Sequence, residues 1–393
     1  MDTTARILWA RGLRAFCDGY VAVLLPAYLQ ALGCSVAQVG VLGTLTLAGS
    51  ALTTLALGRH GHHWPSRRLL LAAAVLMALT GLGFAGLGGF WPLAVVAFFG
   101  TLNPSSGDVS LFLPLEHARL AGTPGGTDDR TRLFARYSLT GALCAAFGAL
   151  ASGVPPWLQD HAGMGALASL RAMFLLYAAV GLLVALLYRG LPAGGSASEP
   201  VAAALGPSKA VVRRLAALFS VDAFAGGLLV NAILALWLSQ RFGLSLASAG
   251  QFFFWSGLLS TASQLAAPAV ARRIGLVNTM VFTHIPASLF LITAAFAPSW
   301  PWALACLLAR SLLSQMDVPT RSAFVMAVVT PAERVAAASF TAVPRSLAAA
   351  GGPAIGGTLL AAGALTAPLV FCGLLKIGYD LALWRSFRRH RLD

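Results

Sequence analysis

Apolar runs of about 20 residues recur along the whole chain, separated by short segments with charged residues, glycine or proline. A helix of this length crosses a hydrocarbon layer of about 30 Å. Because lipid offers no partner for backbone N–H and C=O groups, such a run must be helical. The runs predict twelve spans, over 7–32, 36–58, 68–90, 92–115, 132–153, 168–189, 212–239, 246–270, 275–297, 300–327, 334–361 and 364–385. The predicted fold class is an all-α membrane protein with twelve transmembrane helices.

The composition agrees with a surface that faces lipid. Only 10% of the residues are charged and 58% are hydrophobic, whereas about 25% of a soluble domain is charged. The net charge of +14 comes from basic residues between the spans, so it indicates membrane topology and no nucleic-acid partner. The chain carries no G-x-x-x-x-G-K-[ST], H-E-x-x-H or G-x-S-x-G pattern. This disfavours a P-loop ATPase and an enzyme.

Basic residues are distributed unevenly between the two sets of loops. If the N-terminus is cytoplasmic, the outer loops carry Arg171 and Arg241 and little else, and the inner loops carry most other arginines and lysines. Loops rich in basic residues stay inside. We therefore expect a multi-pass protein of the bacterial cytoplasmic (inner) membrane, with both termini in the cytoplasm.

A polar segment divides the chain into two similar halves. Residues 191–210 are rich in glycine, serine and proline, which is typical of a flexible linker. They separate a predicted N-terminal six-helix bundle, 1–190, from a predicted C-terminal bundle, 211–393. A sensor would be expected to carry a larger cytoplasmic output domain than this linker, so that function is disfavoured.

Several landmarks repeat in order between the halves. The loop 58–68 recurs as 268–275, and Gly33 recurs as Gly243, both at an offset of 210 positions. Asp108 and Asp317 are 209 positions apart. This pattern indicates a duplication of six spans, as in parallel-repeat transporters.

The two repeated loops resemble the short basic loop of the major facilitator superfamily, G-x-x-x-D-R-x-G-R-R. The first copy ends in Arg67-Arg68 and the second in Arg272-Arg273, and His62 and Arg272 replace the acidic residue. The resemblance implies two bundles that transport solute by alternating access, with these four arginines in conformational gates. Residues 314–321 are similar to a stretch in poorly characterised bacterial permeases of this superfamily. Residues 351–357 resemble its G-P-x-x-G-G antiporter motif, in the eleventh span, which slightly favours export.

Four aspartates lie inside predicted spans one, four, seven and ten, namely Asp18, Asp108, Asp222 and Asp317. A charge at the centre of a spanning helix costs about 2.5–3.5 kcal/mol, so such residues face the bundle interior and are functional candidates. The resemblance implies that these four spans line the central cavity. Arg14 and Asp18 are four residues apart, as are Asp317 and Arg321, so each pair shares a helix face and could be a structural ion pair.

Asp108 and Asp222 have no cation four residues away. Without one they would bind and release protons near neutral pH, so we predict them as the proton-coupling residues. The alternative is a structural pairing with Arg136, Arg310 or Arg345. The predicted substrate-cavity residues are Arg14, Asp18, Asn103, Asn231, Arg310, Gln315, Asp317, Arg321 and Arg345. Asparagine and glutamine at this depth could instead serve helix packing, as could His284.

Other polar groups are given structural roles. Glu116, at the inner end of span four, is expected to cap a helix or pair with loop cations. His60, His62 and His63 resemble a metal-binding tract but are expected to form a solvated basic loop, so no metal and no cofactor is predicted. The sequence as a whole predicts a monomeric secondary active transporter in lipid. It moves a small solute, coupled to protons or another ion, with export slightly favoured and uptake by symport as the alternative.

Overall fold

The computed structural model describes residues 2–60, 64–105, 111–122, 127–192, 206–330 and 333–388, and no strand occurs in these ranges. The all-α prediction is confirmed. The helices are α1 (Thr3–Ala31), α2 (Val36–His60), α3 (Ser66–Gly86), α4 (Phe90–Phe99), α5 (Phe112–Ala121), α6 (Thr127–Leu150), α7 (Val154–Ala162), α8 (Ala166–Arg189), α9 (Lys209–Gly227), α10 (Asn231–Phe242), α11 (Leu246–Ile274), α12 (Leu276–Ala295), α13 (Trp300–Ser314), α14 (Asp317–Ala327), α15 (Arg334–Ala361) and α16 (Ala367–Phe387). A 3-10 turn, η2 (Ala151–Gly153), joins α6 to α7.

Helical stretches that could cross a membrane recur along the chain. Seven of them, within the described ranges, have the required length and apolar character, and Ser66–Gly86 and Ala166–Arg189 have the highest hydropathy, 2.2 and 2.3. The expected number of twelve spans stays a prediction.

Three spans predicted as continuous are each built from two helices. Span 212–239 breaks between α9 and α10, span 300–327 breaks at Gln315 and Met316, and span 92–115 breaks after α4. In the second case Pro319 lacks the N–H that would bond to the Gln315 carbonyl, and the helix restarts at Asp317, two residues before the proline. In the third case Thr101 N donates to the Thr80 hydroxyl, 3.3 Å away on α3, rather than to its own helix.

The repeated glycines Gly33 and Gly243 have a common structural role. Gly33 follows α1 with a φ of 83°, and Gly243 follows α10 with a φ of 65°. Both angles lie in the left-handed region, which glycine adopts without steric cost. This landmark of the sequence repeat thus marks the ends of two helices.

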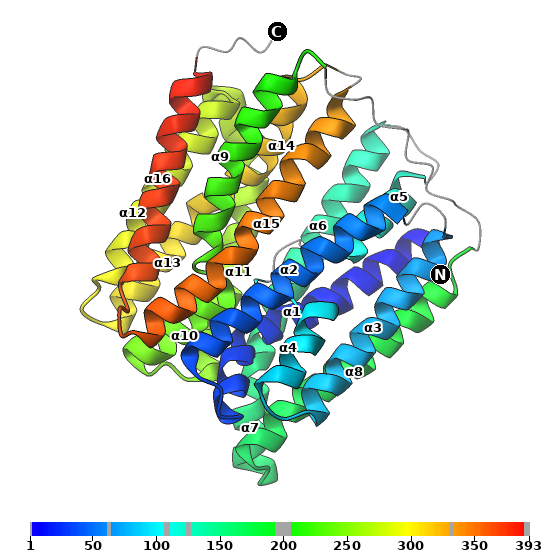
Figure 1. Ribbon diagram of the computed structural model, residues 1–393, viewed down its shortest axis with the longest axis vertical. Coiled ribbons are helices and arrows are strands. Elements are labelled where there is room, and N and C mark those ends of the chain that lie inside the picture. Colours follow the sequence, from blue (N-terminus) through cyan, green and yellow to red (C-terminus); the bar gives the residue numbers. More distant parts are fainter. Residues whose placement is uncertain are drawn as a thin grey trace. The chain divides into compact units, whose positions relative to one another are not determined.

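The chain forms two compact units. Unit 1 comprises Met1–Glu199 and Asn231–Phe254, and unit 2 comprises Pro200–Val230 and Trp255–Asp393. In unit 1, α1 packs on α6 and α3 packs along α8, and α10 also contacts α1. In unit 2, α9 packs along α15 and α12 along α16, as Figure 1 shows. The predicted division at 190 and 211 stays a prediction, and α10 clusters with unit 1.

In each unit, glycines lie where two long helices cross: α1 and α6 in unit 1, and α9 and α15 in unit 2. A Cβ on Gly19 of α1 or on Gly148 of α6 would overlap the backbone of the other helix, and a Cβ on Gly227 of α9 or on Gly352 of α15 would do the same in unit 2. Small residues at such crossings let the two backbones approach closely, which is how helices associate in lipid. The first and fifth predicted spans of each half therefore cross in a similar way.

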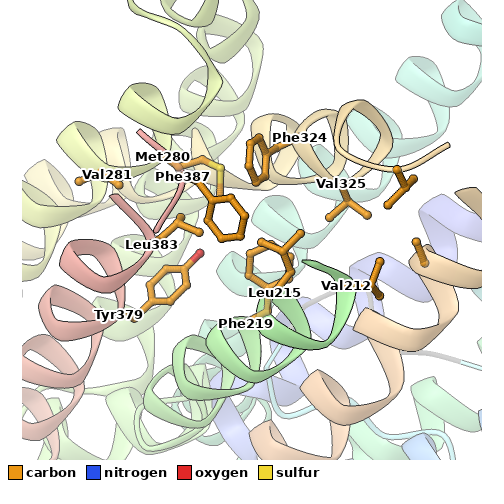
Figure 2. Close-up of a cluster of buried hydrophobic side chains, with 12 residues drawn as sticks. Val212, Leu215, Phe219, Met280, Val281, Phe324, Val325, Tyr379, Leu383 and Phe387 are labelled. Carbon is orange, nitrogen blue, oxygen red and sulfur yellow. The ribbon is translucent and has the colours of Figure 1, made fainter. Parts of the chain in front are cut away.

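Unit 2 has an apolar cluster at the ends of α9, α12, α14 and α16 (Figure 2). Its buried members are Val212, Leu215, Phe219, Met280, Val281, Phe324, Val325, Val329, Ala337, Tyr379, Leu383 and Phe387. Phe324 and Phe387 stack edge to face at 5.4 Å between ring centres. Apolar side chains of these four helices thus pack against one another at this end of unit 2.

Candidate functional site

Unit 1 buries an ion pair between α1 and α5. The guanidinium of Arg14 donates to the carboxylate of Glu116, and the two side chains are 3% and 0% exposed. Tyr137 of α6 donates to Glu116 Oε2 at 2.6 Å, and Tyr188 of α8 donates to Oε1 at 2.6 Å. The Arg14 guanidinium also lies 3.9 Å from the ring centre of Phe112. One cation, one carboxylate and two hydroxyls therefore form a balanced cluster.

This geometry corrects the expectation for Glu116. It is neither a helix cap nor a partner of loop cations, because both oxygens are used inside the helix bundle of unit 1. The sequence did not indicate this, since its partners come from three helices far apart in the chain. Asp18 is half-buried on α1 near Arg14 and Tyr177, and its expected pairing with Arg14 stays a prediction.

Unit 2 buries a larger network centred on Asp222 of α9. Lys376 of α16 donates to Asp222 Oδ1 at 2.6 Å, and Arg321 of α14 donates to Oδ2 at 3.1 Å. Arg321 also lies 3.2 Å from Asp317 Oδ2, one helical turn away. The Asp317–Arg321 pair agrees with the sequence prediction. Asp222 pairs with Lys376 and Arg321, whereas the expected alternatives were Arg136, Arg310 and Arg345.

His284 of α12 extends this network to a second carboxylate. Its Nδ1 lies 3.0 Å and 3.1 Å from the two oxygens of Asp380, and its Nε2 lies 3.5 Å from Lys376 Nζ. The same Nε2 lies 4.0 Å from Asp222 Oδ1. The imidazole of His284 therefore lies between the lysine and two carboxylates. Asp380 is fully buried and His284 nearly so.

The contacts define the unit 2 charge cluster: Asp222, His284, Asp317, Arg321, Lys376 and Asp380. It holds three carboxylates and two permanent cations, so its charge is −1 when all three carboxylates are ionised and His284 is neutral. All six residues are buried. One added proton, shared between His284 and Asp380, makes the cluster neutral.

Two arginines on neighbouring helices lie within electrostatic range of the cluster. Arg310 of α13 lies within electrostatic range of Asp222 and Cys372. Arg345 of α15 lies within range of Arg321, Asp222 and Asp317. Tyr379, one helical turn from Lys376 and next to Asp380, has a buried hydroxyl with no hydrogen-bond partner among the described residues.

The apolar cluster of unit 2 lies directly beside this charge cluster along the same helices. Phe219 precedes Asp222, and Phe324 follows Arg321, each by one helical turn. Tyr379 and Leu383, one and two turns beyond Lys376, belong to the apolar cluster (Figure 2). Closely packed apolar side chains therefore separate the charges from the ends of these helices that carry Lys209 and Arg385.

Other predicted residues have local partners. Asn103 is buried, and its Oδ1 accepts from Ser105 N at 3.1 Å and from Ser105 Oγ at 2.7 Å. Gln315 follows α13 and accepts from Gln264 at 3.3 Å. Asn231 is the half-buried first residue of α10. Asp108 lies outside the described residues, as do His62 and His63.

The predicted gate arginines lie at helix ends. Arg67, in the first turn of α3, donates to the carbonyl of Arg189 at 2.7 Å, across to the end of α8. Arg68 is exposed beside it, and Arg272 and Arg273 are exposed at the end of α11. A role in gating stays a prediction for all four.

Glu333, immediately before α15, joins the segment between α14 and α15 to the segment before α9. It accepts from the hydroxyls of Ser208 and Thr330 at 2.6 Å each, and from Gly206 N. These hydrogen bonds, led by Ser208, stabilise the carboxylate and lower the pKa of Glu333 from 4.5 to about 2. The residue fixes the start of α15, the helix that carries Arg345.

Sequence reasoning missed Lys376 and Asp380. Both lie in the middle of the predicted span 364–385, four residues apart, on one helix face. The rule applied to the aspartates of spans one, four, seven and ten applies equally to them. A search of every span for intramembrane charges would have found both.

Comparisons with known proteins agree with this architecture. The family model of the Major Facilitator Superfamily matches residues 7–308. An uncharacterized membrane protein of Saccharomyces cerevisiae is 25% identical over 415 residues, which cover 96% of this chain and 92% of that protein.

Solved structures show the same fold at low sequence identity. The nucleoside transporter NupG superimposes with a TM-score of 0.74 at 15% identity, covering 100% of both chains. A D-xylose–proton symporter gives a TM-score of 0.74 at 15% identity, covering 98% of both chains. The human organic anion transporter MFSD10 gives 0.63 at 18% identity, covering 98% of this chain and 100% of that one. The chain therefore belongs to the Major Facilitator Superfamily, as a multi-pass membrane protein with the transporter fold of that family.

Proposed function

We propose that this protein is a secondary active transporter that moves a small solute by alternating access and couples its movement to protons. The observation that carries the proposal is the buried His284–Asp380 pair of the unit 2 charge cluster, in which the carboxylate contacts an imidazole at 3.0 and 3.1 Å. An imidazole and a carboxylate can hold one exchangeable proton. Taking up that proton on one side of the membrane and releasing it on the other completes a coupling cycle.

The proton is best carried by the His284–Asp380 pair. Asp222 was predicted for this role, but Lys376 and Arg321 donate to its two oxygens, and two cations favour the ionised carboxylate. Asp222 then connects the proton-binding pair to α14. Asp108 is kept as a second candidate coupling residue. The D-xylose symporter of similar fold is proton-coupled by its title, which agrees with this proposal.

The apolar cluster supports a gated proton path. Its side chains close the bundle of α9, α12, α14 and α16 beside the charges, so a proton cannot cross that end of unit 2 through a standing water column. Access from that side requires these helices to move. Coupling of this kind needs proton access to change with conformation.

Direction of transport has two candidates. Export is favoured only by residues 351–357, which resemble the antiporter motif. Gly352 in this segment packs closely against Gly227, so helix packing explains this glycine whatever the direction of transport. Uptake by symport is the second candidate. Flux measured from each side of a vesicle under the same pH gradient separates them.

The test is solute flux into proteoliposomes under an imposed pH gradient, using the solute that most stabilises the purified protein. We expect accumulation that follows the gradient in the wild type and in the control variant Arg241→Gln, at the exposed end of α10. We expect no accumulation in His284→Gln or Asp380→Asn. Full gradient-driven transport in these two variants and in Asp108→Asn and Asp222→Asn would remove the proton role.

The remaining proposals concern placement and assembly. The distribution of basic residues supports both termini on the cytoplasmic side of a bacterial inner membrane, and we propose a monomer. Cysteines introduced before α1 and after α16 should be labelled by an impermeant reagent only from the cytoplasmic side. Labelling from the outside would contradict this topology.

A further inference from the structure

A surface groove of unit 2 lies between the end of α11, the start of α12 and α14. Its volume is about 280 Å³. Its apolar walls are formed by Pro268 and Ala271 of α11, Leu276 of α12, and Pro319 and Ala323 of α14. Pro268 and Ala323 are exposed and the other three are half-buried. The groove is therefore open to the surroundings of the protein.

Small side chains explain why the groove is not filled. Farther up α11, Gln264 donates to Gln315 at 3.3 Å, which joins α11 to the end of α13. Beyond Gln264, α11 and α14 line the groove with proline and alanine. These side chains are too short to fill the space between the two helices.

The groove lies near the depth at which acyl chains end and lipid head groups begin. The helix α11 has 29 residues, which at 1.5 Å per residue is about 43 Å and exceeds the hydrocarbon thickness of about 30 Å. Its last turn, with Arg272 and Arg273, is therefore expected at head-group level. Pro268, one turn earlier, is expected beside the acyl chains.

Arg272 places a cation at the edge of the groove. It lines the groove, is exposed, and makes no hydrogen bond or ion pair with the other described residues. The residues that line the groove, all of them described, include no acidic one. Interaction with the helix dipole explains an arginine in the last turn of a helix, but it does not explain the open apolar groove beside it.

We propose that this groove binds an anionic phospholipid of the surrounding bilayer, with an acyl chain between α11 and α14 and the lipid phosphate on Arg272. A guanidinium donates two parallel hydrogen bonds to a phosphate, and basic pockets between membrane helices bind anionic head groups. In the topology proposed above, the end of α11 faces the cytoplasmic leaflet, which is the anionic one. The inference does not depend on transport.

The bound lipid contacts the helix that carries part of the unit 2 charge cluster. Thr320 of α14 lines the groove, and Arg321 beside it contacts Asp222 and Asp317. An acyl chain in the groove therefore packs against the first turns of α14. We expect the lipid to raise the thermal stability of the protein.

A second groove of unit 2 has a similar size and no cation. It lies at the other end of α12, has a volume of about 330 Å³, and is lined by residues that include Thr293, Phe296, Trp302 and Cys306. All of its lining residues are described and uncharged. Such a groove accepts the acyl chain of any phospholipid and cannot select a head group, so it provides an internal control.

The test is competition between phosphatidylglycerol and phosphatidylcholine with identical acyl chains for the purified full-length protein. Mass spectrometry of the intact complexes measures the lipid bound, and thermal unfolding is the second readout. We expect the wild type to prefer phosphatidylglycerol and to be stabilised more by it. Arg272→Gln should lower this preference about 5-fold, the effect of one cation beside an anionic head group. Arg272→Lys should lose less, and Arg385→Gln, at an exposed arginine near the end of α16, should match the wild type.

A second pair of variants tests the apolar part of the site. Ala323→Phe fills the groove and should weaken the binding of phosphatidylglycerol with Arg272 intact. Thr293→Phe fills the second groove and should leave the preference unchanged. Glycerol 1-phosphate, which has the phosphate without the acyl chains, should not displace the lipid.

Three results would overturn the inference. The first is equal binding of the two lipids by the wild type. The second is a preference that Arg272→Gln leaves unchanged, or that Arg385→Gln lowers by the same factor. The third is displacement of the lipid by an equal concentration of glycerol 1-phosphate, which would show a phosphate site without an acyl-chain groove. If Ala323→Phe does not fold, the exposed arginine variants and this displacement decide.

Discussion

Unit 1 and unit 2 both bury charged side chains, but they compensate them differently. In unit 1, Arg14 and Glu116 neutralise each other, and two tyrosines donate to the carboxylate. In unit 2, three carboxylates contact two permanent cations and the imidazole of His284. A buried charge must be compensated in both cases. The difference is that unit 1 supplies all of the compensation permanently, whereas unit 2 leaves part of it to exchangeable groups.

The comparison assigns different roles to the two clusters. A closed network with matched charges holds helices together in one arrangement, because removing either partner leaves an uncompensated charge. A network that includes an imidazole can bind and release a proton without breaking its other ion pairs. Unit 1 is therefore expected to fail in stability when its cluster is changed, and unit 2 is expected to fail in coupling.

The largest effect is expected at the His284–Asp380 pair. His284→Gln and Asp380→Asn should each abolish proton-driven accumulation of solute, because neither variant can hold the exchangeable proton. Solute exchange between equal pH values should persist, since it needs no net proton movement. Vesicle flux with and without a pH gradient measures both. Accumulation that survives in both variants would place the proton elsewhere.

In unit 1, Glu116→Leu should lower the free energy of unfolding by about 3–5 kcal/mol, because Arg14 would stay buried without a partner. The double variant Arg14→Met/Glu116→Leu removes both charges and should recover most of that loss, with proton-driven flux retained. Thermal unfolding in detergent measures the stability. A double variant destabilised as much as Glu116→Leu would break the distinction between the units.

Substitution of the glycines at the helix crossings tests the close helix packing that both units share. Gly148→Ala and Gly352→Ala place a Cβ against the backbone of the crossing helix, and overpacking of this kind costs about 1–3 kcal/mol. Gly351→Ala is the matched control, because its Cβ would meet only the Phe224 ring, at 3.8 and 3.9 Å. Unfolding of the three variants checks this. Equal stability of Gly352→Ala and Gly351→Ala would contradict the close crossing.

The smallest effect is expected at Glu333, a permanently compensated charge at the edge of unit 2. Hydrogen bonds lower its pKa to about 2 from 4.5. Because the folded state favours the carboxylate, its contribution is present above pH 4.5 and is lost as the pH falls toward 2. Glu333→Gln should flatten the pH dependence of thermal stability in that window. A variant with an unchanged profile would show that these bonds add no stability.

Much of the fold followed from the sequence because apolar length and loop charge act locally along the chain. The helices and the repeated Gly33 and Gly243 needed no knowledge of tertiary contacts. The interrupted spans were harder: Pro319 signals one break, whereas the break after α4 depends on Thr80 of another helix. That contact joins residues 21 positions apart, which no local pattern records.

The charge clusters show the same limit. Asp317 and Arg321 could be paired from the sequence because they share a helix face. The partners of Asp222 could not, because Lys376 is 154 positions away and Arg321 is 99 positions away. Glu116 was placed at a helix end by its position in the span, and only the packing of α1, α6 and α8 brings its partners to it. Ion pairing between helices depends on which helix faces are in contact, and the sequence of an apolar span does not show which faces these are.

The most direct test of the account is proton movement that accompanies solute flux in weakly buffered proteoliposomes, with the solute that most stabilises the purified protein. The account predicts proton movement together with the solute in the wild type, and none in His284→Gln or Asp380→Asn, because neither variant can hold the exchangeable proton. Solute flux without proton movement in the wild type, or with the same proton movement in both variants, would contradict it.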